Sequence, residues 1–419
     1  MIAEKRKVVV TGMGVIAPNG IGKEAFWEAL ISGKSGIKKI TRFDASSYPC
    51  QIAGEVDGFN PNDFMAPKEA KRCSRYAQYA LAATTFAMED SSLGTKELET
   101  RNVGIFIANS IGGVELLEEQ LFILHEKGLR RVNPATAALG YPQSAASHLA
   151  VQFRIKGPTI TIATGCPGGI QALDIATQCI HKGEIDIAIV GGTEAPITPF
   201  SVAGFCASRG LATDNGHPER ASRPFDRRRS GYVLSEGAGV VILEALGMGH
   251  SRSPRVYGEV LGCSSTNDGY SIYDIDPTGD GLYRAMKNAL NQADIDLTEV
   301  DYISAHAPSV KLTDQVETAS IKKLFGELAY QIPVSSIKSM IGQPLAAAGI
   351  LQLISCLLGF RDQIVPPTIN YEFPDPECDL DYVPNRARKI QLKTALINTH
   401  GFGGINASTV VGKGEERVR

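Results

Sequence analysis

Several features that would assign this chain to a membrane, extracellular or nucleic-acid-binding class are missing. Its 42 Lys and Arg nearly balance 45 Asp and Glu, so there is no basic excess for nucleic acid. No uninterrupted apolar stretch is long enough to span a bilayer, and Met1–Lys7 contains no signal peptide. The eight cysteines form no C-x-x-C pair and no Cys/His cluster at zinc spacing. These absences predict a cytoplasmic protein with reduced cysteines and no metal site.

Strand and helix patterns alternate along the 419 residues, which favours an α/β fold with buried sheets. The polar segment Ser251–Pro254 is a plausible boundary, and it predicts two halves, residues 1–253 and 254–419. The strand candidates are Val8–Gly14, Val103–Ala108, Thr159–Ile162, Ile185–Val190, Gly239–Leu243, Val256–Leu261, Tyr302–Ala305, Thr394–Ile397 and Ser408–Val411. The clearest helical patterns are Ala70–Ala87, Gly281–Ala293 and Thr313–Phe325.

The first strand candidate ends in Gly12-Met-Gly-Val-Ile-Ala17, which matches the G-x-G-x-x-A dinucleotide fingerprint. The fingerprint requires a helix to continue from there, but Pro18-Asn-Gly20 follows at once. No acidic residue is well placed at the end of a second strand. We therefore expect turn glycines rather than a nucleotide site.

Cys166 follows the β-branched run Thr159–Ile162 and precedes Pro167-Gly-Gly169 and a helical pattern. Proline is favoured at the first position of a helix, so Cys166 is predicted to cap that helix. Unpaired backbone N–H groups and the helix dipole would lower the pKa of the thiol there. The segment therefore predicts a nucleophile on a buried strand–helix turn; the alternative is a structural cysteine packed in the core.

Three other segments carry groups that could assist a thiol. His306 ends a strand candidate, where α/β folds place their chemistry. Lys338 and Gln343 lie near the start of a helix of small residues. The strand and Gly-rich loop Asn398–Ala407 could aim backbone N–H groups at an oxyanion, although an ordinary turn would read the same way.

Together these segments resemble the condensing enzymes, namely β-ketoacyl-acyl carrier protein synthases of the type II class and ketosynthases of type II polyketide pathways. The resemblance runs nearly end to end, and the matching motifs are Val9–Gly20, Ala221–Asp226, Gly231–Gly239, Lys338–Gly342, Asp375–Pro384 and Gly401–Gly404. It implies the thiolase-like fold, a duplicated five-layered α-β-α-β-α core. It also implies a dimer, either of two like chains or with a chain-length-factor-like subunit.

The resemblance assigns roles to five positions. Cys166 matches the nucleophile that accepts the acyl chain, and His306 matches the first active-site histidine. Lys338 matches a buried supporting lysine, and Glu317 matches a glutamate near it. Phe402 matches a gating phenylalanine whose backbone N–H forms an oxyanion hole with that of Cys166.

The resemblance also implies how substrates arrive. They are carried on the phosphopantetheine arm of an acyl carrier protein, so no cofactor is expected. The carrier-docking positions of the family correspond to Lys68, Lys71 and Arg72; three basic residues on a helix can equally be a solvated face.

The chain departs from the family mainly inside the site. Gln343 stands where the family has a second histidine, which stabilises the enolate formed on decarboxylation. An amide can still donate a hydrogen bond but cannot become a cation, a loss of about 2–4 kcal/mol at an oxyanion. His306–Val310 lacks the two threonines that hold the pantetheine arm, and Ser271 and Tyr273 also replace channel residues. His400 replaces a phenylalanine, either as an imidazole that supports the nucleophile or as a packed side chain.

These features leave three hypotheses. The first is a decarboxylating condensing enzyme of a specialised polyketide or fatty-acyl pathway, an acyltransferase of the 3-oxoacyl-[acyl-carrier-protein] synthase type that uses a malonyl extender. The second is a ketosynthase-like acyltransferase, or a non-decarboxylating condensing enzyme, that uses the Cys166 acyl-enzyme. The third is a non-catalytic partner subunit, which the retained Cys166 argues against.

Overall fold

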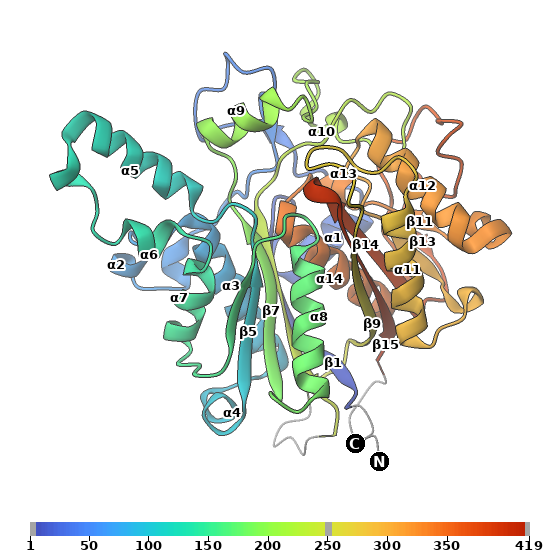
Figure 1. The fold of residues 1–419 in the computed structure, drawn as a ribbon, viewed down its shortest axis with the longest axis horizontal. Helices are drawn as coiled ribbons and strands as arrows, with labels where there is room; N and C mark the ends of the chain where they lie inside the picture. Colours follow the sequence, from blue (N-terminus) through green and yellow to red (C-terminus); the bar gives the residue numbers. More distant parts are fainter. Residues whose placement is uncertain (1–5, 248–253, 415–419) are drawn as a thin grey trace.

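The computed structural model describes residues 6–247 and 254–414, so the boundary predicted at residue 253 lies outside the described residues. In this part of the chain, eleven strands join one mixed sheet, and helices cover it on both sides (Figure 1). Five of the strands come from the N-terminal half and five from the C-terminal half. The eleventh, Gly20–Ile21, is a short partner of the first strand.

The two halves repeat one strand order. Numbered along the chain within each half, the strands lie in the spatial order 3-2-4-5-1. The N-terminal set is β1 (Val8–Ala17), β5 (Val103–Ala108), β6 (Thr159–Ile162), β7 (Ile187–Glu194) and β8 (Gly237–Ala245). The C-terminal set is β9 (Gly258–Asn267), β10 (Tyr302–Ser304), β11 (Val334–Ser335), β14 (Thr394–Gly401) and β15 (Ile405–Lys413). The first strands of the two halves, β1 and β9, pair with each other at Val9 and Val10.

Helices at equivalent places in the two halves complete the layers. Helix α3 (Arg75–Ser91) packs on β1 and β8, and its counterpart α11 (Asp280–Ala293) packs on β9 and β15. Helices α8 (Gly168–His181) and α14 (Ala348–Asp362) pack on each other and on strands of both halves. The predicted duplicated α-β-α-β-α architecture follows from this arrangement, with α8 and α14 as the central layer.

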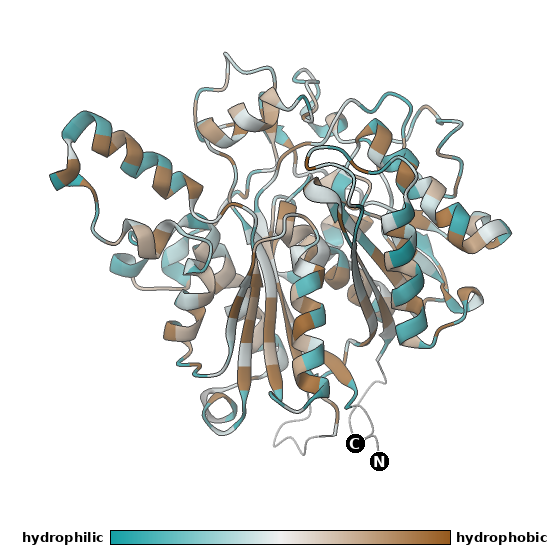
Figure 2. Cartoon of the chain, viewed as in Figure 1, coloured by the Kyte–Doolittle hydropathy of each residue, from teal (hydrophilic) through white to brown (hydrophobic). Residues whose placement is uncertain are grey.

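Hydrophobic patterning explains which helix takes which layer. In α11 the buried residues Leu282, Ala285, Met286 and Ala289 recur at helical spacing, so one face packs on the sheet. Figure 2 shows hydrophilic colour over much of the rest of that helix. In α14 every residue from Ala348 to Phe360 is buried, as expected for a helix covered on all sides.

The central helix α14 belongs to a largely apolar stretch that Gln352 interrupts. By length and composition, Leu345–Asp362 is long and apolar enough to cross a membrane, with a mean hydropathy of 1.4. In this fold 89% of that stretch is buried inside the protein, where it forms the core between the two halves. It is therefore a core helix.

Two sequence expectations about the N-terminal half were wrong. Gly12 and Gly14 lie within β1 rather than in a turn, and a Cβ on Gly14 would come within 1.8 Å of the Ala83 carbonyl oxygen. These glycines let the strand approach α3 closely. Strand β6 has the predicted bounds but lies at the sheet edge, with Thr159 and Ile160 exposed rather than buried.

The remaining strand predictions differ from the structure chiefly at the ends. Val103–Ala108 is reproduced residue for residue, whereas β9 starts two residues later than predicted and continues to Asn267. The helix predicted from Ala70 splits into the short helix α2 (Pro67–Ala70) and α3. The helices predicted from Gly281 and Thr313 correspond to α11 and α12 (Lys311–Phe325).

Candidate active site

Five predicted site residues, among them Phe402, line one cavity of about 270 Å³. Cys166 comes from the turn between β6 and α8, and His306 follows β10. Gln343 follows the short helix α13 (Lys338–Ile341), and His400 lies near the end of β14. Because β10, β11 and β14 are parallel, their carboxyl ends bring these segments together at one edge of the C-terminal half.

The turn that carries Cys166 differs by one residue from the prediction. Helix α8 begins at Gly168 with Pro167 as its cap, so Cys166 precedes the cap. Gly165 has a φ of +71°, a left-handed conformation that favours glycine before the nucleophile. The side chain of Cys166 is 6% exposed and lies at the wall of the cavity.

The thiol of Cys166 is not the low-pKa group that the sequence predicted. Burial raises its pKa to about 11, although the Lys338 ammonium lowers it and the Glu194 carboxyl raises it further. The prediction considered only the helix end, whereas the apolar surroundings come from distant segments such as Leu211 and Leu345. At neutral pH this thiol is therefore protonated.

This protonation state predicts how Cys166 reacts with an alkylating agent. Modification of Cys166 by iodoacetamide should accelerate about tenfold per pH unit from pH 7 to 9, because the thiolate fraction grows tenfold per unit below the pKa. Peptide mass spectrometry of Cys166 measures the rate, and a free cysteine peptide of pKa about 8.5 is the control. A plateau for Cys166 within this range would contradict the raised pKa.

Gln343 connects Cys166 to His306. Its Nε2 lies 3.3 Å from Cys166 Sγ, to which it donates, and 3.4 Å from His306 Nε2. Its backbone is held on both sides, since its N–H donates to Val233 O at 2.7 Å and its carbonyl accepts from Ser235 N at 3.1 Å. The amide is thus fixed in place as a donor between two reacting groups.

His306 is a neutral imidazole in this cavity. Burial, followed by repulsion from Lys338 and His400, holds its pKa well below the usual value. Its Nδ1 is buried and makes no hydrogen bond within the described residues. A neutral ring can accept a proton from the thiol or donate a hydrogen bond to a carbonyl oxygen.

Lys338 lies behind these groups with 1% exposure. Its Nζ donates to Gln352 Oε1 at 3.1 Å, and burial lowers its pKa to about 8 against the attraction of Glu317, Cys166 and Asp314. Gln352 in turn donates to the carbonyl oxygens of Ser304, Ala305 and Asn398. Gln352 was not predicted as a site residue, although a single amide within the apolar run Ile350–Ile354 was a signal.

Glu317 of α12 organises the other side of the cavity. Its carboxylate accepts from the backbone N–H groups of His306 (2.9 Å) and Ala307 (2.7 Å) and from Asn398 Nδ2 (3.2 Å). Burial alone would raise its pKa, but His400 and these N–H groups bring the pKa below its ordinary value. Glu317 is therefore a buried carboxylate beside two imidazoles.

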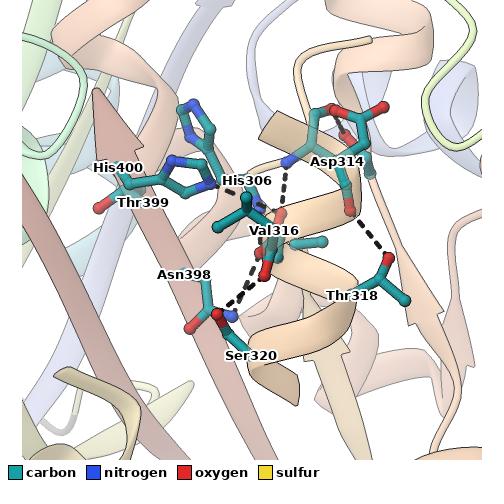
Figure 3. Close-up of polar contacts among 12 residues, drawn as sticks. His306, Asp314, Val316, Thr318, Ser320, Asn398, Thr399 and His400 are labelled. Carbon is teal, nitrogen blue, oxygen red and sulfur yellow. Dashed lines mark hydrogen bonds and ion pairs between the residues drawn. The ribbon is translucent and has the colours of Figure 1, made fainter. Parts of the chain in front are cut away.

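His400 joins this group from β14. Figure 3 shows Asn398 and His400 projecting from the strand toward α12, with His306 beside His400. The two rings are 4.3 Å apart between centroids, and His400 Nε2 lies 3.9 Å from Glu317 Oε2, an ion-pair distance longer than a hydrogen bond. His400 is 2% exposed, so the structure places this imidazole inside the site.

The mouth of the cavity is formed by more exposed residues. Phe402 is 53% exposed and Tyr273 is 75% exposed, and both line the cavity together with Pro308 and Val310. Ser271 does not line it; its hydroxyl accepts from the backbone N–H groups of Tyr273 and Asp274.

The remaining predicted residues lie elsewhere. Lys68, Lys71 and Arg72 are exposed on and just after α2, and none of them lines the cavity. Within residues 6–247 and 254–414, no group of three or more His, Cys, Asp or Glu side chains is arranged to hold a metal ion.

Comparison with known families accounts for this arrangement. The family described as "Beta-ketoacyl synthase, N-terminal domain" matches residues 5–247, and "Beta-ketoacyl synthase, C-terminal domain" matches residues 257–372. This chain belongs to the β-ketoacyl synthase family. It is therefore an acyltransferase-type condensing enzyme with the thiolase-like fold, and the resemblance read from its motifs is confirmed.

Individual relatives of this β-ketoacyl synthase include 3-oxoacyl-[acyl-carrier-protein] synthase 2 of Coxiella burnetii (strain RSA 493 / Nine Mile phase I). It is 41% identical over 410 residues, which cover 98% of this chain and 99% of the relative. The enzyme of the same name from Synechocystis sp. (strain ATCC 27184 / PCC 6803 / Kazusa) is 41% identical over 405 residues, 97% of each chain.

Two solved structures are similar over 98% of this chain and all of theirs. One is a type II polyketide ketosynthase bound to the hexaketide and in complex with its acyl carrier protein, at a TM-score of 0.91 and 34% identity. The other is the ishigamide ketosynthase/chain length factor, at a TM-score of 0.92 and 32% identity.

Proposed function

We propose that the chain transfers an acyl group from an acyl carrier protein to Cys166 and then condenses it with a malonyl-type extender in a specialised polyketide or fatty-acyl pathway. The observation that carries this proposal is the Gln343 amide, which lies within 3.4 Å of both Cys166 Sγ and His306 Nε2 in one cavity. A nucleophile, a neutral imidazole and a fixed donor together suit both steps.

In the first step Cys166 Sγ attacks the carbonyl carbon of the acyl thioester. The thiol proton passes to the departing pantetheine thiol, and His306 is the group near Cys166 that can carry it. The backbone N–H groups of Cys166 and Phe402 would hold the oxyanion. The products are acyl-Cys166 and a free carrier thiol.

In the second step the malonyl thioester loses carbon dioxide, and the resulting carbanion attacks the acyl-Cys166 carbonyl. The Cys166 thiolate leaves and takes up a proton, giving a 3-oxoacyl carrier protein. His306 and Gln343 would donate to the malonyl thioester oxygen while negative charge develops there. Lys338 and Glu317, which lie outside the cavity lining and act on His306, would support this step through charge.

A second function is favoured by the same amide. Gln343 cannot become a cation and the pKa of His306 is well below its usual value, so neither of these two groups brings a positive charge to the malonyl oxygen. A ketosynthase-like acyltransferase would need only the Cys166 acyl-enzyme and an amine, alcohol or thiol acceptor. A non-catalytic partner subunit is disfavoured because Cys166 lines the cavity with His306 and Gln343.

The proposal includes two protein partners. The exposed cations Lys68, Lys71 and Arg72 suit an acidic carrier protein. For dimerisation, the unpaired edge of β6 and the exposed apolar residues of α5 (Val114–Lys127), including Leu121 and Phe122, offer surface for a like chain or a chain-length-factor-like subunit. Of the two solved structures named above, one contains a ketosynthase with its acyl carrier protein, and the other is a ketosynthase/chain length factor.

One experiment separates the two functions. Intact-mass analysis of the protein with a panel of acyl-carrier proteins, with and without malonyl-carrier protein, reports acylation, loss of carbon dioxide and condensation together. A 3-oxoacyl product supports the condensing enzyme. Acyl-Cys166 without any release of carbon dioxide from malonyl-carrier protein would favour the acyltransferase.

Substitution of Gln343 by histidine tests the decarboxylation step by itself. Gln343→His should raise the rate of carbon dioxide release about 10²-fold, because an imidazole can become a charged donor at the developing oxyanion. Release of labelled carbon dioxide from malonyl-carrier protein measures this rate. Gln343→Asn, which keeps the amide, is the control, and an unchanged rate in Gln343→His would show that charge at this position does not limit the step.

A further inference from the structure

The side chain of Tyr232 carries an unused hydroxyl in the wall of the Cys166 cavity. The residue is 6% exposed and lines the same cavity as Cys166, His306 and Gln343. Its phenolic oxygen is buried and makes no hydrogen bond within the described residues. A phenylalanine would fill the same space without stranding a polar atom.

Neighbouring backbone holds this tyrosine in place. Its N–H donates to Gly210 O at 3.0 Å, and its carbonyl accepts from Ala212 N at 2.9 Å. A Cβ on Gly210 would come within 2.8 Å of the Tyr232 ring and within 3.2 Å of its hydroxyl oxygen, so the ring lies against a position that only glycine tolerates. The fold therefore fixes the position of the Tyr232 hydroxyl.

The surroundings of the hydroxyl are mostly apolar, and Ser208 is its polar neighbour among the groups that act on the phenol. The edge of the Phe205 ring faces Tyr232, with centroids 6.1 Å apart, and Leu211 and Leu345 belong to the same apolar cluster. Ser208 also lines the cavity and lowers the pKa of the phenol, but its hydroxyl donates to Phe205 O at 2.8 Å, and the Tyr232 oxygen has no partner within hydrogen-bond distance in the described residues. Burial and the nearby Cys166 raise the pKa of the phenol, so it keeps its proton and remains a donor.

An unpaired buried hydroxyl is costly, and the cost disappears when a ligand supplies the acceptor. A saturated acyl chain on Cys166 would cover this hydroxyl and leave it unpaired. A chain with an oxygen near the thioester would pair it. Discrimination of this kind is strong, because a site built around a hydrogen bond rejects analogues that lack it.

From this geometry we infer that Tyr232 selects the acyl group: its hydroxyl donates to a keto or hydroxy oxygen on the acyl chain held by Cys166. The substrate class is then an oxygenated acyl thioester rather than a saturated fatty acyl thioester. This inference rests on the proposed acylation of Cys166, and it adds a specificity-determining residue to that step.

The test compares acyl donors that differ only in the oxygen. Hexanoyl, 3-oxohexanoyl, 3-hydroxyhexanoyl and 5-hydroxyhexanoyl thioesters of N-acetylcysteamine are incubated with the full chain and with Tyr232→Phe, which removes one oxygen atom. Intact mass follows the acylation rate of Cys166. The wild type should load at least one oxygenated chain about tenfold faster than hexanoate, and Tyr232→Phe should lose that advantage while loading hexanoate at least as fast.

Each other outcome overturns the inference. A wild-type protein that loads all four donors equally has no such selection. An equal loss for every donor in Tyr232→Phe would assign the hydroxyl to the pantetheine arm or to structure. If Tyr232→Phe does not fold, competition between hexanoyl and oxygenated donors on the wild type decides the question alone. Absence of any acyl group on wild-type Cys166 would instead refute the proposed function, so the two failures are distinct.

Discussion

Replacement of Cys166 by alanine is expected to abolish acyl-enzyme formation, with a loss of at least about 10³-fold in product formation. Cys166 is the only cysteine lining the active-site cavity in the described part of the chain. The other groups there, His306 and Gln343, can move protons or donate hydrogen bonds but have no sulfur to hold the chain. Intact mass after incubation with acyl-carrier protein measures the result.

The matched control is Cys179→Ala. Cys179 lies on the same helix α8 and is partly exposed, but it does not line the cavity. That variant should acquire the acyl mass at the wild-type rate. If Cys166→Ala supports full activity, the chain acts as a non-catalytic partner subunit and both catalytic proposals fail.

The raised pKa of the thiol adds a requirement to this reaction. With a pKa of about 11, Cys166 must lose its proton while substrate is bound, because almost no thiolate is present at neutral pH. His306 is neutral and hydrogen-bonded to the Gln343 amide that also reaches Cys166. The proposed acylation therefore requires the thiol proton to leave during attack on the thioester, and His306 is the neutral base proposed to take it.

The placement of Cys166 on a strand–helix turn was predictable from the sequence because its signals are local. A β-branched strand, a glycine before Cys166 and a proline with two glycines after it specify a strand, a turn and a helix within a dozen residues. His306 at the end of its strand followed the same logic. The resemblance to condensing enzymes then predicted roles for Lys338 and Glu317 and the thiolase-like fold.

The electrostatics were not predictable because they come from segments distant in sequence. The pKa of Cys166 depends on burial by residues near 211 and 345 and on charges at Glu194 and Lys338. The edge position of β6 likewise depends on strand order, which no local pattern in Thr159–Ile162 contains. A periodic pattern reports which residues are apolar, but not which face of a sheet is covered.

The glycines of β1 show a third kind of feature that the sequence alone does not predict. Gly12 and Gly14 fit a turn equally well in the sequence, and only the approach of α3 to within contact of their Cα atoms shows why side chains are excluded. Gln352 was missed for a related reason, since its partners at Lys338, Ser304 and Asn398 are brought together only by the fold.

Glu317→Gln is expected to destabilise the protein by about 3–5 kcal/mol and to reduce condensation about 10²-fold or more. The carboxylate is fully buried, holds the backbone N–H groups of His306 and Ala307, and attracts the Lys338 ammonium. Glutamine keeps the shape but removes the strongest of the buried negative charges that attract Lys338, and Asp314 is the buried carboxyl group that remains. Denaturant unfolding and steady-state condensation rates measure the two effects.

The charge argument can be isolated with a double-mutant cycle. Lys338→Met removes the ammonium, so the double variant Glu317→Gln/Lys338→Met contains neither buried charge. Because removing one partner of a buried pair costs more than removing both, the double variant should be more stable than Glu317→Gln alone. Additive losses in stability would mean that Glu317 acts only through its hydrogen bonds to the His306 segment.

The pH dependence of stability gives an independent check on the same carboxylate. The pKa of Glu317 is lower in the folded protein than its ordinary value, so its contribution to stability is present above the unfolded pKa and is lost as pH falls through the folded pKa. Wild type should therefore lose more stability than Glu317→Gln when the pH falls below about 4.5. Equal losses would show that the Glu317 carboxyl group is not ionised. Asp314, the other buried carboxyl group that attracts Lys338, would then be the charge partner of Lys338.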